Sequence, residues 1–186
     1  MTTLLNPSDC CVLFVDPQDQ HFGQLVSTIS EPLVSLFRRL SDAISVANVP
    51  SHLVMASQGQ ISQHQLLNSC ASSRPTVHVE RDIGPTWSSS GVATALVASN
   101  RTSLVICGFW LETKVSFLAL SALSAGFDVY LLADATPSRV PATRETSIAR
   151  LLQAGVVPTT LPQLLAEWVE QSSDLALRAS LGVLIC

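Results

Sequence analysis

The fold is decided by residues 103–134, which read SLVICGFWLETKVSFLALSALSAGFDVYLLAD. This stretch begins with an apolar run at 103–109 and ends with another at 127–134. Continuous rather than alternating apolarity is typical of strands that are covered on both faces. Between the runs lies a helical segment, 113–126, whose final Gly126 favours a helix end. A strand, a helix and a second strand in this order predict a parallel sheet with a right-handed crossover.

The same alternation continues on both sides of this stretch. Further strands are expected at 11–16, 52–56, 76–80 and 156–160, and further helices at 30–49, 143–155 and 161–171. The first of these helices has apolar residues at helical spacing, Ser30 as its expected N-cap and Pro50 as its stop. Strands that alternate with helices predict a three-layer αβα fold, in which one parallel sheet of about six strands lies between two layers of helices.

Length and composition predict a single domain over residues 1–186. A chain of 186 residues is long enough to bury one core and too short for two ordinary ones. Hydrophobic residues make up 47% of the chain and charged residues 13%, so we expect a homo-oligomer that covers part of the apolar excess. The apolar tail at 173–186 is expected to dock on the body of the domain or on a neighbouring subunit.

The charge pattern argues against two classes of partner. The net charge is −4 and no run of lysine or arginine is present, so we expect no nucleic-acid binding. No stretch reaches the roughly 18 consecutive apolar residues of a membrane helix, and residues 1–10 lack the pattern of a secretory leader. We therefore expect a cytoplasmic protein with no membrane partner.

The five cysteines show no metal-binding or redox motif. They are Cys10, Cys11, Cys70, Cys107 and Cys186, and none of them forms a C-x-x-C pair. In a cytoplasmic protein this pattern favours free, mostly buried thiols.

Three charged residues are expected at the carboxyl edge of the sheet, where parallel folds collect their ligands. Asp16 ends the first strand, Arg81 follows the third, and Lys114 begins the helix at 113–126. Each also fits a structural role: Asp16 as a cap, Arg81 in a surface ion pair, and Lys114 as an exposed cation. Lys114 is nevertheless unusual, because it is the only lysine beside nine arginines. The helix dipole also disfavours a cation at this end by up to about 1 kcal/mol.

Two parts of the chain resemble a known family. CVLFVDPQDQHF at 11–22 is similar to the opening of the isochorismatase-like cysteine hydrolases. Two later stretches are similar to the second half of the same family. They read ICGFWLETKVSFLALSALSAGFDVYLLADATPSR at 106–139 and ATRETSIARLLQAGV at 142–156. The resemblance covers about residues 8–171 and is closest to the branch of uncharacterised oligomeric hydrolases. It implies the strand order 3-2-1-4-5-6 and hydrolysis of a small amide, imide or vinyl ether, with no cofactor.

The resemblance also implies a catalytic triad of an aspartate, a basic residue and a cysteine nucleophile. Asp16 matches the aspartate, and Arg81 is the best match for the basic residue. The cysteine position, six residues after Gly108, is occupied by Lys114. The nucleophile of the family is therefore missing from its place.

The turn before Lys114 and the pocket around it follow from the same resemblance. Leu111 replaces the threonine of the family motif, and backbone N–H groups of the turn at Trp110 and Leu111 are expected to form an oxyanion hole. The Phe109–Trp110 bond is expected to be a cis peptide. Residues expected to line the pocket and its mouth are Gln18, Trp87, Glu112, Trp110, Asp19 and His21.

The sequence leaves three functions open for Lys114. In the first, Lys114 pairs with Asp16, and the chain is a pseudoenzyme that serves in binding or assembly. In the second, some residual or altered hydrolase activity survives. In the third, the helix dipole, burial and Arg81 lower the pKa of Lys114, and the neutral amine forms a Schiff base or acts as a general base. Cys107 is a poor substitute nucleophile, because it lies inside the strand and before the turn.

No metal site is expected. The nicotinamidase branch of the family holds a divalent ion with an aspartate and two histidines placed after the second strand. The corresponding region here offers His64 alone, with His52 at the far end of the strand. A single histidine makes a poor metal site, so we expect no metal and at most a small-molecule ligand.

Overall fold

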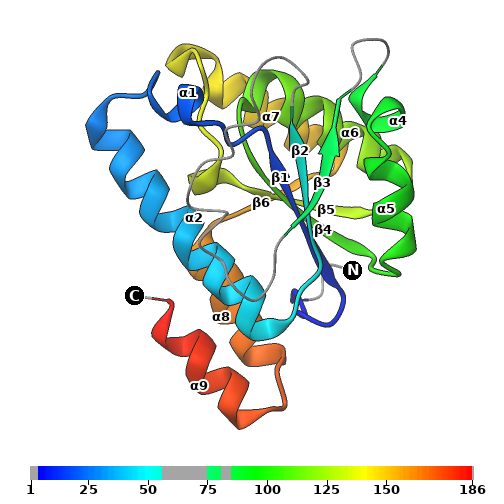
Figure 1. The fold of residues 1–186 in the computed structure, drawn as a ribbon, viewed down its shortest axis with the longest axis vertical. Coiled ribbons are helices and arrows are strands. Elements are labelled where there is room, and N and C mark those ends of the chain that lie inside the picture. Colours follow the sequence, from blue (N-terminus) through cyan, green and yellow to red (C-terminus); the bar gives the residue numbers. More distant parts are fainter. Residues whose placement is uncertain (1–3, 56–74, 81–84, 186) are drawn as a thin grey trace.

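Six parallel strands form the centre of the molecule (Figure 1). The computed structural model describes residues 4–55, 75–80 and 85–185. The strands are β1 (Cys10–Val15), β2 (Ser51–Met55), β3 (Thr76–Val79), β4 (Ser103–Gly108), β5 (Asp128–Leu132) and β6 (Val157–Thr159). They are hydrogen-bonded in the order β3-β2-β1-β4-β5-β6, and all five pairings are parallel. This confirms the expected order 3-2-1-4-5-6.

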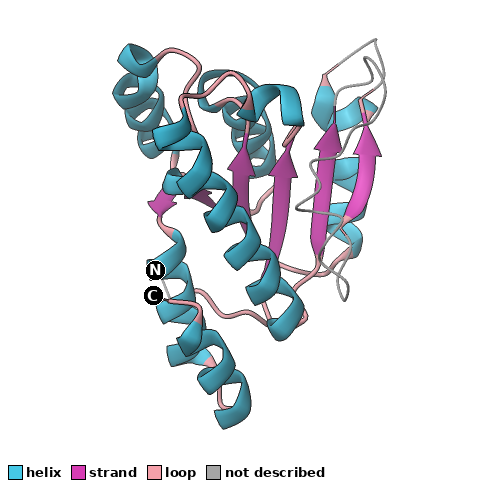
Figure 2. Cartoon of the chain, turned by 60° about the vertical axis from the view of Figure 1, so that its left-hand side comes forward, coloured by secondary structure: helices cyan, strands magenta, loops and turns pink. Residues whose placement is uncertain are grey.

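Helices cover both faces of the sheet, which confirms the three-layer architecture. One face carries α2 (Ser27–Ala47), α8 (Leu161–Gln171) and α9 (Leu175–Val183), and Figure 2 shows the long α2 crossing in front of the strands. The other face carries α5 (Val92–Ala98), α6 (Ser116–Ser124) and α7 (Arg144–Ala154). The short elements are α1 (Asp19–Phe22), α4 (Thr86–Ser89) and helical turns at Leu111–Val115, Ala133–Ala135 and Pro141–Thr143.

The strand residues divide between two cores, one on each face. Every residue of β1 is buried. Val12 and Phe14 pack toward α2 and α8, whereas Cys11 and Leu13 pack toward α5 and α6. Because both sides of the strand enter an apolar core, its sequence is apolar throughout rather than alternating.

The start of α2 differs from the expectation. The sequence predicts Ser30 as the N-cap, whereas the helix begins at Ser27 and Val26 holds the cap position. Pro32 therefore lies inside the helix, where its missing N–H leaves one backbone hydrogen bond unmade near the exposed first turns. The helix ends where Asn48 adopts a left-handed conformation with φ of 52°.

Four helices were not expected, and the tail is ordered. No helix was predicted at 19–22, 86–89 or 92–98, which form α1, α4 and α5, and the tail was predicted to dock but not to be helical. The tail folds into α9 and docks on the body of the domain, as expected: Leu181 is buried, and the Arg39 guanidinium donates hydrogen bonds to the Leu184 and Ile185 carbonyls. None of the described helices combines the length and apolar composition needed to cross a membrane.

Candidate functional site

The carboxyl ends of β1 and β4 approach each other closely at Gly108. Gly108 pairs with Val15 in the sheet and has φ of 121°, a conformation that favours glycine. A Cβ atom on Gly108 would lie 2.1 Å from the Val15 carbonyl oxygen, so no larger residue fits. The next residue, Phe109, donates its backbone N–H to the same carbonyl at 2.8 Å. This contact fixes where the segment after β4 passes the end of β1.

Asp16 leaves the end of β1 in a left-handed conformation with φ of 50°, which aspartate tolerates better than most residues. Its backbone N–H donates to the Val54 carbonyl at 2.7 Å. Its own carbonyl accepts from the Gln18 N–H at 2.8 Å and lies 2.8 Å from His21 Nδ1. The carboxylate is buried, and its Oδ1 accepts a hydrogen bond from Gln18 Nε2 at 2.5 Å. Asp16 is therefore held from both its backbone and its side chain.

The segment between β4 and α6 forms the turn that the family resemblance predicts. The Phe109–Trp110 peptide is cis, which confirms the expectation. Leu111–Val115 follows as one π-helical turn. The Leu111 N–H donates to the Pro137 carbonyl at 3.1 Å, so this donor is already occupied and does not face an oxyanion. Trp110 is the other residue expected at the oxyanion hole. Its backbone N–H donates no such hydrogen bond within the described part of the chain.

The Lys114 side chain extends from this turn and places its ammonium group between two carboxylates. Its Nζ lies 3.1 Å from Asp16 Oδ2 and 2.6 Å from Glu80 Oε2. Glu80 is held in turn by its backbone N–H, which donates to the Met55 carbonyl at 2.8 Å, and by the Thr86 hydroxyl, which donates to its other carboxylate oxygen. The exposed fractions of the Lys114, Asp16 and Glu80 side chains are 27%, 5% and 15%. The ammonium therefore fills a largely buried space between two anions.

These contacts keep Lys114 protonated. Burial alone lowers the pKa of Lys114. The hydrogen bond to Glu80 and the negative charges of Asp16 and Glu80 outweigh burial, so the pKa lies above its ordinary value of 10.5. The lowered pKa required for amine chemistry is not what this environment produces.

Comparison with known proteins assigns the fold to a family. The sequence profile of the isochorismatase domain matches residues 10–163. The chain belongs to the isochorismatase family. It is 28% identical over 156 residues to the probable hydrolase YcaC of Escherichia coli, an alignment that covers 81% of this chain and 73% of the relative.

Solved structures of the isochorismatase fold superpose over nearly the whole chain. The E. coli YcaC gene product, described as an octameric hydrolase of unknown specificity, has a TM-score of 0.84 at 24% identity, with 99% of this chain and 91% of that chain covered. YcaC from Pseudomonas aeruginosa, with hexane-2,5-diol and covalent acrylamide, has a TM-score of 0.83 at 23% identity. The superposition covers 100% of this chain and 91% of that chain. The MAR1 ribonuclease of Caenorhabditis elegans has a TM-score of 0.80 at 18% identity, with 98% of this chain and 92% of that chain covered. At these identities the structural likeness shows the fold alone.

Within this isochorismatase-family site, the partner that sequence reasoning missed is Glu80. Arg81, the expected basic residue, lies outside the described residues. Glu80 was not among the residues expected at the site. A signal was present, because Glu80 follows directly on β3 and so reaches the same edge of the sheet as Asp16. A buried lysine also requires more than one acceptor for its three donors.

The residues expected to line the pocket fall into two groups. Gln18 contacts Asp16 directly, and the His21 ring packs on Phe109 and Trp110 with ring centroids 5.5 Å from each. By contrast, the ring of Trp87 packs against Phe127, with centroids 6.4 Å apart, on the side of the sheet covered by α6.

Glu112 supports the turn from outside. Its Oε1 accepts the backbone N–H groups of Arg139 and Val140 at 2.8 and 3.0 Å. It therefore ties the segment after β5 to the turn that carries Lys114, next to the hydrogen bond between Leu111 and Pro137. Asp19 lies in α1, the short helix that follows the Asp16 loop.

The described cysteines are buried, and burial raises their pKa values. Cys107 lies inside β4 with no exposed surface, and burial raises its pKa. Burial likewise raises the pKa of Cys10 to about 12 and that of Cys11 to about 11, both in β1. Cys70 and Cys186 lie outside the described residues. A thiol with a raised pKa is a poor nucleophile at neutral pH.

In the part of the chain that the structure describes, no three side chains of histidine, cysteine, aspartate or glutamate are grouped to hold a metal ion. His64 lies outside the described residues. His52 and His78 do meet beneath α5, with 3.2 Å between His52 Nδ1 and His78 Nε2, but two histidines alone make no metal site. Burial lowers the pKa of His52 to about 4, with a further contribution from His78, and burial also lowers that of His78.

Proposed function

We propose that this isochorismatase-family protein is a hydrolase-fold pseudoenzyme, in which the ancestral site is closed by an ion-paired lysine and serves binding or assembly instead of nucleophilic hydrolysis. The observation that carries the proposal is the position of the Lys114 ammonium, between Asp16 Oδ2 and Glu80 Oε2. A protonated amine has no lone pair with which to attack a carbonyl. Its partners raise the pKa of Lys114, so deprotonation at neutral pH is unfavourable.

The state of Asp16 supports the same proposal. In the family the aspartate exchanges a proton with the reacting groups. Here Oδ1 accepts from Gln18 and Oδ2 accepts from Lys114. Both carboxylate oxygens of Asp16 are therefore engaged by donors of this chain, and the ammonium on Oδ2 comes from the position that the family's thiol would hold.

The charges of the site are rearranged relative to the family triad. The resemblance implies one aspartate, one basic residue and one cysteine, whereas the described site holds two carboxylates and one ammonium. Two buried carboxylates need a cation close by, and Lys114 supplies it from the position of the nucleophile. Replacing Lys114 by a cysteine alone would therefore leave the two carboxylates without this cation.

We infer that the protein acts as a homo-oligomer and that any ligand is a small molecule. Only 13% of its residues are charged, which is little for a solvated monomer. The structurally similar E. coli YcaC is described as octameric, which supports assembly.

The test measures hydrolysis of a panel of small amides and esters by the wild type, Lys114→Cys, and Lys114→Cys with Glu80→Lys. We expect the wild type to be silent and the single variant to be weak, because Glu80 raises the pKa of a neighbouring thiol. The double variant restores a cation beside the thiol and should exceed the single variant by at least about 100-fold. Asp16→Asn in the double-variant background should remove the gain.

Amine chemistry is tested on the unmodified chain. Wild-type protein is incubated with small aldehydes and borohydride, and the intact mass is measured. We expect no reduced adduct on Lys114. Hydrolysis by the wild type that disappears in Lys114→Met, or an adduct on Lys114, would overturn the pseudoenzyme proposal.

A further inference from the structure

Helix α6 carries no charge on its outer face and exposes a large apolar side chain there. No charged residue occurs between positions 115 and 127. Leu118, Ala119 and Ala122 are buried against the sheet. On the outer face Phe117 is 58% exposed, and Leu120 is only partly buried. The polar face of a surface helix normally carries charged side chains, so an uncharged outer face with an exposed phenyl ring is a surface that a partner could cover.

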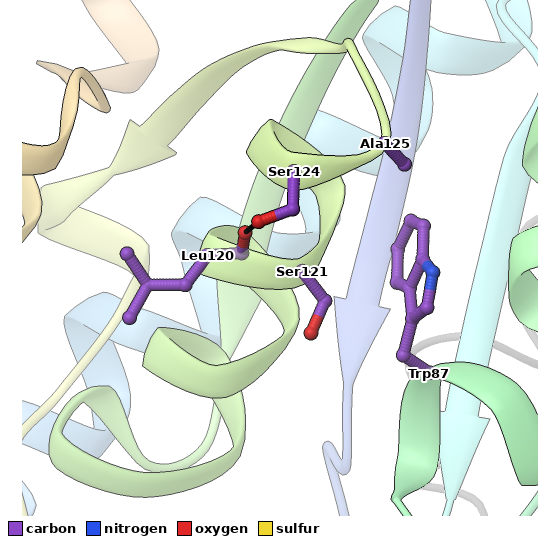
Figure 3. A pocket seen from close by; sticks show the side chains of 5 residues that line it. All are labelled: Trp87, Leu120, Ser121, Ser124 and Ala125. Carbon is purple, nitrogen blue, oxygen red and sulfur yellow. Dashed lines mark hydrogen bonds between the residues drawn. The ribbon is translucent and has the colours of Figure 1, made fainter.

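Two hollows lie along the same face, on either side of Trp87. The first, of about 390 Å³, is lined by Trp87, Leu120, Ser121, Ser124 and Ala125, and Figure 3 shows the indole ring opposite Ser121 and Ala125. The second, of about 340 Å³, is lined by Pro85, Thr86, Trp87, Phe117, Leu118 and Ser121. The exposed phenyl ring and the hollow beside Trp87 thus belong to one continuous surface, which we call the α6 face.

We propose that the α6 face binds the α6 face of a second copy of this chain about a two-fold axis. Positions 117, 121 and 124 share one side of the helix, because residues four and three apart lie above one another. With 1.5 Å of rise per residue, Phe117 and Ser124 are about 10 Å apart along the helix axis. Two antiparallel helices that cross near Ser121 therefore place each Phe117 over the hollow between Trp87 and Ser124 of the partner. A knob and a hollow on the same patch are what a two-fold interface requires.

The charge and hydrogen bonding of the α6 face favour a second copy as its occupant. Two identical charged surfaces would repel each other on contact, but this segment carries no charge. Ser124 Oγ already donates to the Leu120 carbonyl at 3.0 Å, so covering this hydroxyl leaves no donor unpaired. Phenylalanine and tryptophan are typical of the centre of a protein interface. The inference rests on the proposed assembly and specifies the surface that performs it.

The first test compares Phe117→Asp with Val97→Asp by light scattering and sedimentation. Val97 is a matched control, because it is 62% exposed on a neighbouring helix and lines neither hollow. We expect Phe117→Asp to raise the dissociation constant of the two-fold contact by at least about 100-fold, and Val97→Asp to leave it unchanged. Far-UV circular dichroism checks that both variants fold. An assembled Phe117→Asp protein, or equal loss in both variants, would overturn the α6 face as the interface.

The second test uses cross-linking across the axis. Ser121→Cys should form a disulfide-linked dimer on mild oxidation, and Ser173→Cys, exposed between α8 and α9, should not exceed the wild type. Equal cross-linking in the two variants would contradict the proposed axis. A wild-type monomer would refute both the interface and the proposed assembly, while the hydrolysis panel reports on Lys114 independently.

Discussion

Burial lowers the pKa of the basic groups in two polar clusters of this protein, but neighbouring charges reverse the effect in one of them. At the carboxyl edge of the sheet, Lys114 lies between Asp16 and Glu80, and its pKa is raised. Beneath α5, His52 and His78 are in contact with each other, and burial lowers both of their pKa values. The clusters differ in the charge of the nearest neighbour. A buried cation remains charged when anions surround it, and a buried base whose charged neighbour is another base loses its proton more readily.

The largest effect is expected from removing the cation of the first cluster. Lys114→Met leaves two carboxylates facing each other in a largely buried space and should lower the free energy of unfolding at pH 7 by about 4 kcal/mol. Urea denaturation checks the value, and Lys114→Arg, which keeps the charge, should lose less than half as much. Equal stability of Lys114→Met and wild type would show that the ion pairs contribute nothing.

For the second cluster, of His52 and His78, we expect the free energy of unfolding to fall in weak acid. The pKa of His52 is about 4 in the folded chain and 6.5 when unfolded, so between these values the unfolded chain binds more protons. Stability is therefore complete above about pH 6.5 and falls by about 3 kcal/mol as the pH drops toward 4. Chemical denaturation at a series of pH values measures this slope. His52→Leu should flatten it, and an unchanged slope in that variant would assign the acid sensitivity to other groups.

The smallest effect concerns the balance inside the first cluster. Glu80→Gln removes one of the two charges on Lys114 and should cost about 1.5 kcal/mol, while bringing the pKa of Lys114 closer to its ordinary value. Because the chain has one lysine, selective isotope labelling gives a single side-chain NMR signal that can be titrated. The wild-type signal should titrate above pH 10.5. If the variant titrates at a higher pH than the wild type, Glu80 is not the partner that holds the proton.

Much of the fold could be predicted because its sequence signals are strong. Strands that are buried on both faces read as continuous apolar runs, and Gly155 marks the end of α7 with φ of 106°. The start of α2 was misplaced, because Ser30 is a better cap by type than Val26. Helices α4 and α5 were missed, because they are only four and seven residues long. Local preference is weak in such short segments, and packing on the sheet decides them.

For the candidate site, the sequence predicted which residues lie near the sheet edge but not all of the contacts between them. The structure brings Asp16 and Lys114 together at the sheet edge, a contact that one of the sequence interpretations anticipates. The contribution of Glu80 depends on one residue of register at the end of β3. Successive side chains of a strand point to opposite faces, so the sequence alone did not say which residue after β3 reaches Lys114.

The position of Lys114 also affects how the folded chain can be modified. It carries the one ε-amino group of these 186 residues, and that group is protonated and bonded to two carboxylates. Acylating reagents, amine cross-linkers and enzymes that join a modifier to lysine all require an accessible, neutral amine. Such chemistry can reach this chain's side chains only when the ion pairs open, so labelling of Lys114 would directly report how often the site opens.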